Sequence, residues 1–262
     1  WSEFDEAVKG QLEAALAKGG KVRFLTNTIT SPTTLQMIAD FVAANPEADI
    51  KHVNYDAVSS SGTLEANMES FGKAALPTYN LAKAKSIVSI GADFMSEFPD
   101  SIQLTAQYAQ GRKPENGWMS KHFQFESRMS LSGSNADVRV PVKPSEQGKI
   151  AIQLFNYVEA KLSGKTPSED FHKKVVMAGN HLVANKGQSV VIAGANDKHL
   201  QVVVNAINNL LGNYGKTLDI AKQSNVRKGV DADFAFLVNE MNSGSVDFLL
   251  VDGVNPSYSA AA

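Results

Sequence analysis

Residues 123–150 read FQFESRMSLSGSNADVRVPVKPSEQGKI, and this stretch decides the fold prediction. Alternating apolar side chains at 122–126 predict a buried strand. The segment 127–135, rich in Ser, Gly and Asn, predicts a loop directly after that strand. Glu126 is therefore expected at the tip of a strand and above a polar loop, which is where open α/β sheets bind ligands.

The second half of the stretch predicts a short strand and a helix. Val, Arg, Val, Pro and Val at 138–142 form a short strand pattern, which Pro144 ends. Ser145 is a candidate N-cap for a helix over about 146–162, because its hydroxyl can accept a hydrogen bond from a free backbone N–H. A helix N-terminus is thus expected beside Glu126.

Strand and helix patterns alternate along the rest of the chain. Apolar runs bounded by Gly, Pro and Ser predict strands at 22–26, 50–54, 86–90, 121–125, 189–193 and 247–251. Helical patterns lie between them at 3–18, 31–44, 63–71, 100–110, 168–184, 197–211 and 231–242, and Ser2, Ser31 and Ser168 are expected to cap the helices that they begin. This alternation predicts an α/β protein with mainly parallel, doubly wound sheets.

Composition excludes several classes of protein. The chain has 262 residues, of which 43% are hydrophobic and 20% charged, and its net charge of −2 argues against a nucleic-acid surface. No run approaches the ~18 apolar residues of a membrane span. The absence of Cys excludes disulfides and thiolate metal sites. The five His residues lack metal-ligand spacing, so no metal site is expected.

Five segments resemble the molybdopterin oxidoreductases of the dimethyl sulfoxide reductase superfamily. Glu126–Asp137, with the sequence ESRMSLSGSNAD, is similar to the D-P-R-x-T-x-T-A-x-x-A-D signature of that family. The other four follow the family's order: IGADF at 90–94 resembles G-x-N-P, PSEQ at 144–147 resembles P-G-T-D, LGNYG at 211–215 resembles L-x-x-x-G-N-x-G, and VDGVNP at 251–256 resembles a second G-x-N-P.

The resemblance implies a discontinuous domain layout. Residues 1–55 with 186–262 would form a first α/β lobe, and residues 56–165 a second. Residues 166–185 would form a connecting helix. We also expect the chain to be a fragment of a longer polypeptide, because it begins with Trp1 and stops directly after the last motif.

The departures from the family pattern concern the cofactor. The acidic residues that hold the guanine of the pterin dinucleotide in the family correspond to Glu126, which is one carbon longer, and Gln147, which is neutral. A carboxylate can accept both guanine N–H donors, whereas a carboxamide cannot. The metal-ligand position falls near Ser59, where a Ser-rich turn before a helix is the simpler interpretation. No cofactor is therefore expected, and the dinucleotide positions, here called vestigial, are Gly91, Asp93, Glu126, Arg128, Gln147 and Asn255. In a packed cleft, Arg128 would pair with Glu126 or with a neighbouring chain.

One branch of the superfamily is more similar than the rest. YDAVS at 55–59, GADF at 91–94 and the 126–137 segment resemble the iron–sulfur B subunit of bacterial alternative complex III. This resemblance implies a non-catalytic scaffold domain, with the iron–sulfur clusters in the C-terminal part of the same subunit. It also implies multihaem cytochrome c and integral membrane quinol-binding subunits as partners, on the periplasmic side of the inner membrane.

Two alternatives remain open at this point. The chain could be a fragment of an active molybdenum or tungsten bis-pterin oxidoreductase, with Ser59 as the metal ligand. It could also be a nucleotide-binding α/β domain without redox chemistry.

Overall fold

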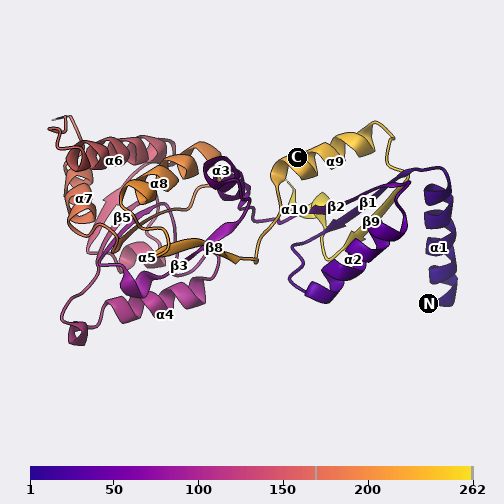
Figure 1. The fold of residues 1–262 in the computed structure, drawn as a ribbon, viewed down its shortest axis with the longest axis horizontal. Coiled ribbons are helices and arrows are strands. Elements are labelled where there is room, and N and C mark those ends of the chain that lie inside the picture. The colour runs from indigo at the N-terminus through magenta and orange to yellow at the C-terminus, as the bar shows by residue number, and fades with distance from the viewer. Residues whose placement is uncertain (169, 261–262) are drawn as a thin grey trace. The chain divides into compact units, whose positions relative to one another are not determined.

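A computed structural model describes residues 1–168 and 170–260 of the chain (Figure 1). The chain divides into two compact units, with residues 1–61 and 225–262 in unit 1 and residues 62–224 in unit 2. Both units contain a parallel sheet with helices packed against it, which confirms the predicted α/β class. The units change over after residues 61 and 224, whereas the layout implied by the resemblance placed the ends of its first lobe at residues 55 and 186.

Unit 1 is built on a three-stranded parallel sheet of order β2–β1–β9. Its strands are β1 (Lys21–Thr26), β2 (Asp49–Asn54) and β9 (Phe248–Asp252), and its helices are α1 (Ser2–Ala17), α2 (Pro32–Ala44), α9 (Asp231–Asn242) and α10 (Pro256–Ser259). Phe24 packs with α1 and α2 on one face, and Leu25 packs with Leu237 of α9 on the other.

A buried cation lies in the central strand of unit 1. The Arg23 side chain is fully buried, and its guanidinium donates to both carboxylate oxygens of Glu240 at 2.8 Å. It also donates to the Asp49 carboxylate. A buried charge is tolerated only when it is paired in this way, so these contacts connect α9 and β2 to the central strand.

Unit 2 is built on a four-stranded parallel sheet of order β6–β5–β4–β7. Its strands are β4 (Ser86–Ile90), β5 (Lys121–Glu126), β6 (Val138–Pro141) and β7 (Ser189–Ala193). The helices α6 (Gln147–Leu162), α7 (Lys173–Ala184) and α8 (Lys198–Leu210) cover one face, and α4 (Ser101–Gly111) covers the other. Because both faces are covered, the central strand β4 and its neighbour β7 are buried throughout.

Smaller elements complete unit 2. An antiparallel ribbon of β3 (Leu76–Tyr79) and β8 (Leu218–Ser224) was not predicted from the sequence. The remaining helical elements are α3 (Ser61–Phe71), α5 (Leu131–Ser134) and the 3-10 turns η1 (Leu81–Lys83), η2 (Pro114–Asn116) and η3 (Pro144–Glu146). Strand β7, which the predicted layout assigned to the first lobe, pairs with β4 instead.

The predicted strands agree with the structure to within one residue at each end, while three predicted helix caps are wrong. Ser31 does cap α2, because its hydroxyl accepts from Thr34 N. Ser2 lies within α1, and Ser145 lies in η3 rather than at the start of α6. Helix α7 begins at Lys173, and its cap His172 lies four residues after the expected cap Ser168. Residue 169 of that predicted helix lies outside the described residues.

Candidate functional site at the carboxyl ends of the sheets

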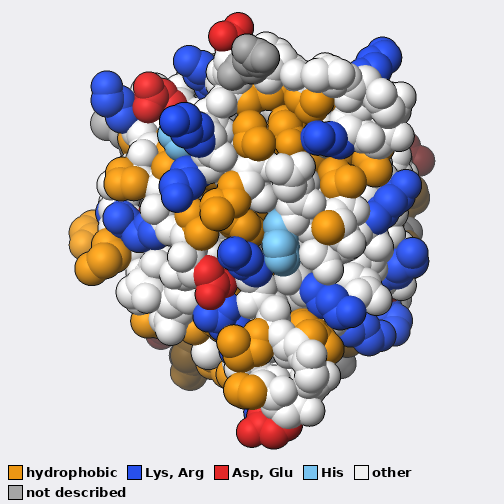
Figure 2. All heavy atoms as spheres, turned by 90° about the vertical axis from the view of Figure 1, so that its left-hand side faces the viewer, with side chains coloured by type: hydrophobic (Ala, Val, Ile, Leu, Met, Phe, Trp, Pro, Cys, Tyr) orange, Lys and Arg blue, Asp and Glu red, His pale blue; other side chains and the backbone are white. Residues whose placement is uncertain are grey.

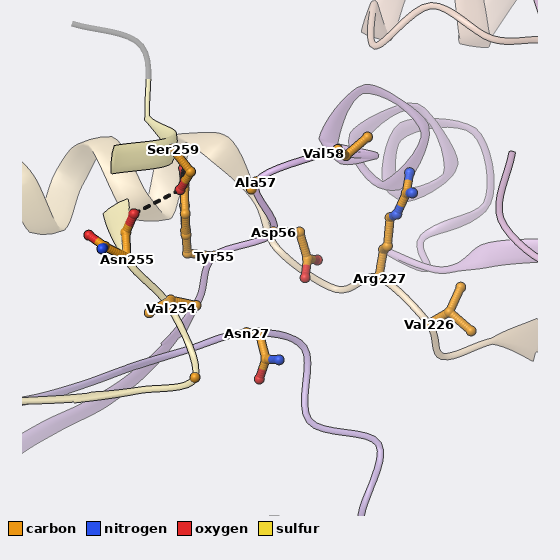
Figure 3. A pocket seen from close by; sticks show the side chains of 11 residues that line it. Asn27, Tyr55, Asp56, Ala57, Val58, Val226, Arg227, Val254, Asn255 and Ser259 are labelled. Carbon is orange, nitrogen blue, oxygen red and sulfur yellow. Dashed lines mark hydrogen bonds between the residues drawn. The ribbon is translucent and has the colours of Figure 1, made fainter. Parts of the chain in front are cut away.

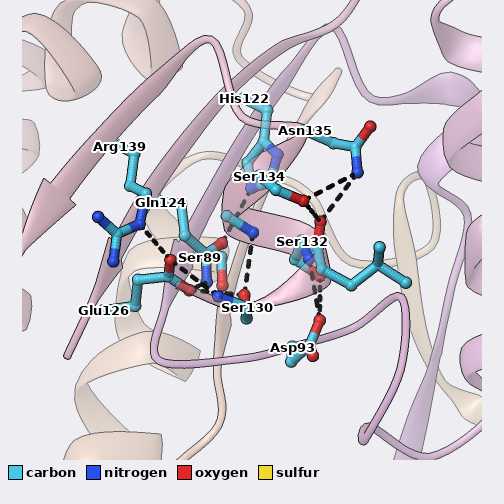
Figure 4. A network of polar contacts seen from close by, with 12 residues as sticks. Ser89, Asp93, His122, Gln124, Glu126, Ser130, Ser132, Ser134, Asn135 and Arg139 are labelled. Atoms are coloured by element: carbon cyan, nitrogen blue, oxygen red, sulfur yellow. Dashed lines mark hydrogen bonds and ion pairs between the residues drawn. The ribbon is translucent and has the colours of Figure 1, made fainter. Parts of the chain in front are cut away.

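Glu126 ends strand β5, and its carboxylate is held entirely by its own unit (Figure 4). Only 3% of the residue is exposed. One carboxylate oxygen accepts from the Arg139 Nε–H at 2.5 Å and from Ser130 N. The other accepts from the Ser130 hydroxyl at 2.6 Å and from Gln124 Nε2 at 3.0 Å. Both oxygens that could receive the N–H donors of a guanine are therefore already in use.

Strand geometry explains why these groups meet. Gln124 and Glu126 are two residues apart on β5 and so point to the same face. Arg139 is opposite Gln124 in the β5–β6 register, which brings its side chain beside both. Ser130 is the N-cap of α5, and its hydroxyl accepts from Gly133 N while donating to Glu126.

Electrostatics keep Glu126 ionised. Burial raises the pKa of the carboxyl group, but hydrogen bonds from Ser130, Arg139 and Gln124 together outweigh it, and the pKa lies below the ordinary value. The same polar row continues down β5, because His122 Nε2 lies 3.0 Å from Gln124 Oε1. Burial lowers the pKa of His122 to about 4, and the contact with Gln124 offsets part of that shift.

Two further vestigial positions are also engaged within unit 2. Asp93, two residues after the turn that ends β4, accepts from Ser132 N at 3.0 Å and from the Ser132 hydroxyl at 2.8 Å. Gln147, the first residue of α6, lies against Gly91. A Cβ placed on Gly91 would be 2.7 Å from Gln147 Nε2. The carboxamide therefore occupies the space directly above the Gly91 backbone, where a ligand would have to approach the end of β4.

Arg128 does not pair with Glu126, the first of the two partners expected for it. Its guanidinium contacts the Glu97 carboxylate in an ion pair, and both side chains are well exposed. The partner of Glu126 is instead Arg139, which sequence reasoning did not single out. The available signal in the sequence was a charged residue between two valines on a short strand. The partner of that residue could not be predicted, because it depends on the pairing of β5 with β6.

Ser59 lies in unit 1 and takes part in a turn. Its hydroxyl accepts from Ser61 N at 2.9 Å, at the point where α3 begins. This contact matches the interpretation of a Ser-rich turn before a helix. Within residues 1–168 and 170–260, no group of three or more His, Cys, Asp or Glu side chains is arranged to hold a metal ion.

Unit 1 has a pocket at the carboxyl ends of its own strands (Figure 3). Its volume is about 280 Å³, and it is lined by residues that follow β1, β2 and β9, among them Asn27, Asp56 and Asn255. The Asp56 carboxylate accepts from Thr28 and from the backbone N–H groups of 228 and 229, so its charge is already compensated. Asn255 is the only vestigial position that lines this pocket.

The helices within the described residues are too short or too polar to cross a membrane.

Comparison with known proteins identifies the fold alone. No protein-family model matches the chain, and no curated protein does. Among solved structures, acetylene hydratase from Pelobacter acetylenicus is similar, with a TM-score of 0.57 and 11% identity over 84% of this chain and 34% of that one. The formyltransferase/hydrolase complex from Methylorubrum extorquens has a TM-score of 0.47 and 14% identity over 93% of this chain and 57% of that one. That score is too low to support an argument.

The chain thus has a molybdopterin-enzyme-like α/β fold, as the sequence predicted. It spans about a third of the length of acetylene hydratase. The residues at its vestigial positions fit a pterin dinucleotide poorly, because Glu126 is buried and fully hydrogen-bonded and because Gln147 lies on Gly91.

Proposed function

We propose that this chain is a cofactor-free scaffold domain of the iron–sulfur B subunit of a quinol-oxidising respiratory complex of the alternative complex III type. Electrons would pass through clusters in another part of the subunit, and the present residues would hold that part and its partner subunits in place. Multihaem cytochrome c and integral membrane quinol-binding subunits on the periplasmic side of the inner membrane are the partners that this proposal implies.

The state of Glu126 is the observation that supports the proposal most. A dinucleotide-binding acid needs carboxylate oxygens that are free to accept from the ligand. Here four donors of the same unit already surround a carboxylate that is almost fully buried. Releasing them would leave Arg139 and Ser130 without their partner, and breaking hydrogen bonds to a charged group costs about 1.5–3 kcal/mol each. A ligand would have to supply that free energy before it gained any affinity.

The surface of unit 2 also fits an assembly role. Figure 2 shows a face on which Lys and Arg side chains clearly outnumber acidic ones, with hydrophobic side chains between them. A positive, partly apolar face can steer an acidic protein partner towards it.

Metal and pterin analysis of the purified native complex tests the proposal. We expect no molybdenum or tungsten above background and no pterin released on acid treatment. We also expect Ser59→Ala to leave quinol oxidation by the complex nearly unchanged, because the Ser59 hydroxyl supports only a turn. One metal atom per subunit, or a large loss of turnover in that variant, would instead support the molybdenum or tungsten oxidoreductase.

The pocket of unit 1 favours a second candidate, a nucleotide-binding domain without redox chemistry. Pockets at the carboxyl ends of parallel strands are common nucleotide sites, and two carboxamides and Arg227 line this one. Calorimetric titration of the chain with AMP and GMP tests this candidate. Binding that is weakened by Arg227→Ala and unaffected by Arg128→Ala in unit 2 would support it, and no heat of binding at millimolar nucleotide would exclude it.

A further inference from the structure

Asn116 and Gly117 form the only Asn–Gly pair in the sequence. Such pairs are prone to spontaneous deamidation, because glycine has no Cβ to shield its backbone nitrogen from the neighbouring carboxamide. The pair lies in unit 2, at the end of the 3-10 turn η2 between helix α4 and strand β5. Neither the scaffold proposal nor the nucleotide-binding alternative uses it, so it is an independent feature of the chain.

The tip of this connection is exposed, whereas its base is fixed. Ser120 N donates to Gly111 O at 2.9 Å and closes the base beside the sheet. Residues 113–117 at the tip are all exposed, and Gly117 N donates to Pro114 O at 3.0 Å to form the turn. A single exposed turn of this kind can open locally while the sheet stays folded.

The carboxamide of Asn116 caps helix α4. Its Nδ2 donates to Gln110 O at 2.8 Å. Gln110 lies in the last turn of α4, where backbone carbonyls have no partner within the helix. Gly117 has a φ of 73° and no atom within 4 Å of its Cβ position, so the turn has room to rotate once this cap is released.

We propose that Asn116 is a site of spontaneous deamidation and that the reaction removes the C-terminal cap of α4. In the opened turn the backbone nitrogen of Gly117 attacks Cγ of Asn116 and forms a C–N bond. The Cγ–Nδ2 bond breaks, and the amide leaves as ammonia with the proton that the Gly117 nitrogen gives up. Water then opens the resulting succinimide ring at either carbonyl, which produces aspartate or isoaspartate at position 116.

Both products weaken the turn. A carboxylate has no N–H group, so it cannot donate to Gln110 O. Its negative charge is also unfavourable at a helix C-terminus. Isoaspartate adds a methylene group to the backbone before Gly117, which displaces the Gly117 N–H from Pro114 O. The reaction therefore proceeds in one direction and releases residues 113–117 from the end of α4.

Peptide mapping of the folded full-length chain tests the site. Trypsin releases residues 113–121, KPENGWMSK, in which Asn116 is the only carboxamide side chain. After prolonged incubation at mildly alkaline pH, we expect this peptide to gain the mass of one amide-to-acid conversion and to separate into an aspartate and an isoaspartate form. Asn116→Gln is the control and should show no gain, because its longer side chain would have to close a larger ring.

Asn242 provides an internal control in the same digest. It is exposed and is followed by the small residue Ser243. The Ser243 N–H donates to Asn239 O at 3.0 Å at the end of α9, which keeps the backbone nitrogen away from the Asn242 carboxamide. We expect Asn242 to remain unmodified when Asn116 has been converted.

The free peptide 113–121 measures how far the fold slows the reaction. The hydrogen bonds of Asn116 Nδ2 and Gly117 N must both break before the attack. We therefore expect conversion in the folded chain to be about tenfold slower than in the peptide. Equal rates would show that these contacts do not restrain the pair and would overturn the capping role of Asn116.

Hydrogen exchange measures the released cap directly. Asn116→Asp reproduces one product, and we expect the Gly117 amide of this variant to exchange roughly fivefold faster, which corresponds to one hydrogen bond of typical net strength. The matched control is Asn185→Asp, which removes the equivalent contact with His181 O at the end of α7 and should leave the Gly117 amide unchanged.

Two results would overturn the proposal of a deamidation site. One is an unmodified peptide 113–121 from the folded chain at a time when the free peptide is fully converted. The other is conversion of Asn242 at the same rate as Asn116, which would mean that exposure alone decides. An unchanged exchange rate of the Gly117 amide in Asn116→Asp would overturn the loss of the α4 cap.

Discussion

The Arg139 guanidinium donates its Nε–H to the buried carboxylate of Glu126 at 2.5 Å, from the neighbouring strand of the unit 2 sheet. This contact turns a candidate ligand-binding acid into part of the internal packing of the unit. The carboxylate ties together β5, β6 and the N-cap of α5, so it has a structural role that a ligand-binding residue at a loop tip would not have.

Arg139→Ala should therefore destabilise the protein. The substitution leaves Glu126 buried without its cationic partner, and the expected loss of unfolding free energy is about 1.5–3 kcal/mol. Urea denaturation at neutral pH measures it. Arg128→Ala is the control, because its ion pair with Glu97 is exposed and should contribute less than about 1 kcal/mol. Equal losses for the two variants would contradict the assignment of Arg139 as the partner of the buried acid.

The buried imidazole of His122 should make stability depend on pH. Its pKa is lowered to about 4, since burial disfavours the charged ring. The unfolded chain takes up the proton near pH 6.5, so folding loses free energy as the pH falls below that value and the loss levels off near pH 4. Between pH 7 and pH 5 this amounts to about 2 kcal/mol.

Comparison with His122→Gln isolates that contribution. Carboxyl groups of ordinary pKa contribute little above pH 5, and His52 and His181, whose pKa values burial also lowers, are present in both proteins. We expect the variant to lose about 2 kcal/mol less than the unmodified chain between pH 7 and pH 5. The exposed His199→Gln serves as the control and should keep the full dependence. An unchanged slope in His122→Gln would mean that the ring is solvated.

The sequence predicted the parallel strands well because their signal is local. Residues 190–193 of β7 are a continuous apolar run, and the structure buries every residue of it. The β3–β8 ribbon was missed because β8 reads LDIAKQS, where only Leu218 is buried and the rest is half-exposed or exposed. Polar residues on an antiparallel edge resemble a loop, and the pairing of Leu76 with Ser224 depends on chain segments far apart in sequence.

The candidate site was predicted only in part, for a similar reason. A sequence motif can place Glu126 at the end of a strand, but it cannot show which donors surround it. That depends on the register of Arg139 against Gln124 and on the turn that brings Ser130 back over the strand. The expected boundary between the two lobes was misplaced for the same reason. The apolar sequence of β7 is compatible with either sheet, and only its pairing with β4 assigns it to unit 2.

Ile192→Ala should be among the most costly substitutions in the chain. Ile192 is fully buried in β7, against the cluster that includes Leu104 of α4. Removing three methyl or methylene groups from such a position costs about 2–5 kcal/mol. Ile102→Ala is the control, because Ile102 is 89% exposed on the same helix and should change stability little. A loss below about 0.5 kcal/mol at Ile192 would contradict the packed core.

Gly91→Ala tests the closure of the site at the end of β4. Gly91 has a φ of 68°, which costs a residue with a side chain about 1–2 kcal/mol. The new methyl group would also meet the Gln147 carboxamide, whose nitrogen lies 2.7 Å from the Cβ position. The total loss should therefore exceed the backbone cost alone, and denaturant unfolding of the purified chain measures it.

A double substitution separates the two contributions. Gln147→Ala removes the carboxamide that lies on Gly91, so adding it to Gly91→Ala should recover the steric part and leave the backbone cost of about 1–2 kcal/mol. Gly72→Ala is the control for the backbone alone, because Gly72 has the same φ of 68° and nothing lies near its Cβ position. If Gln147→Ala recovers no stability in the Gly91→Ala protein, the carboxamide does not close the space above Gly91, and the case for a packed cleft rests on Glu126 alone.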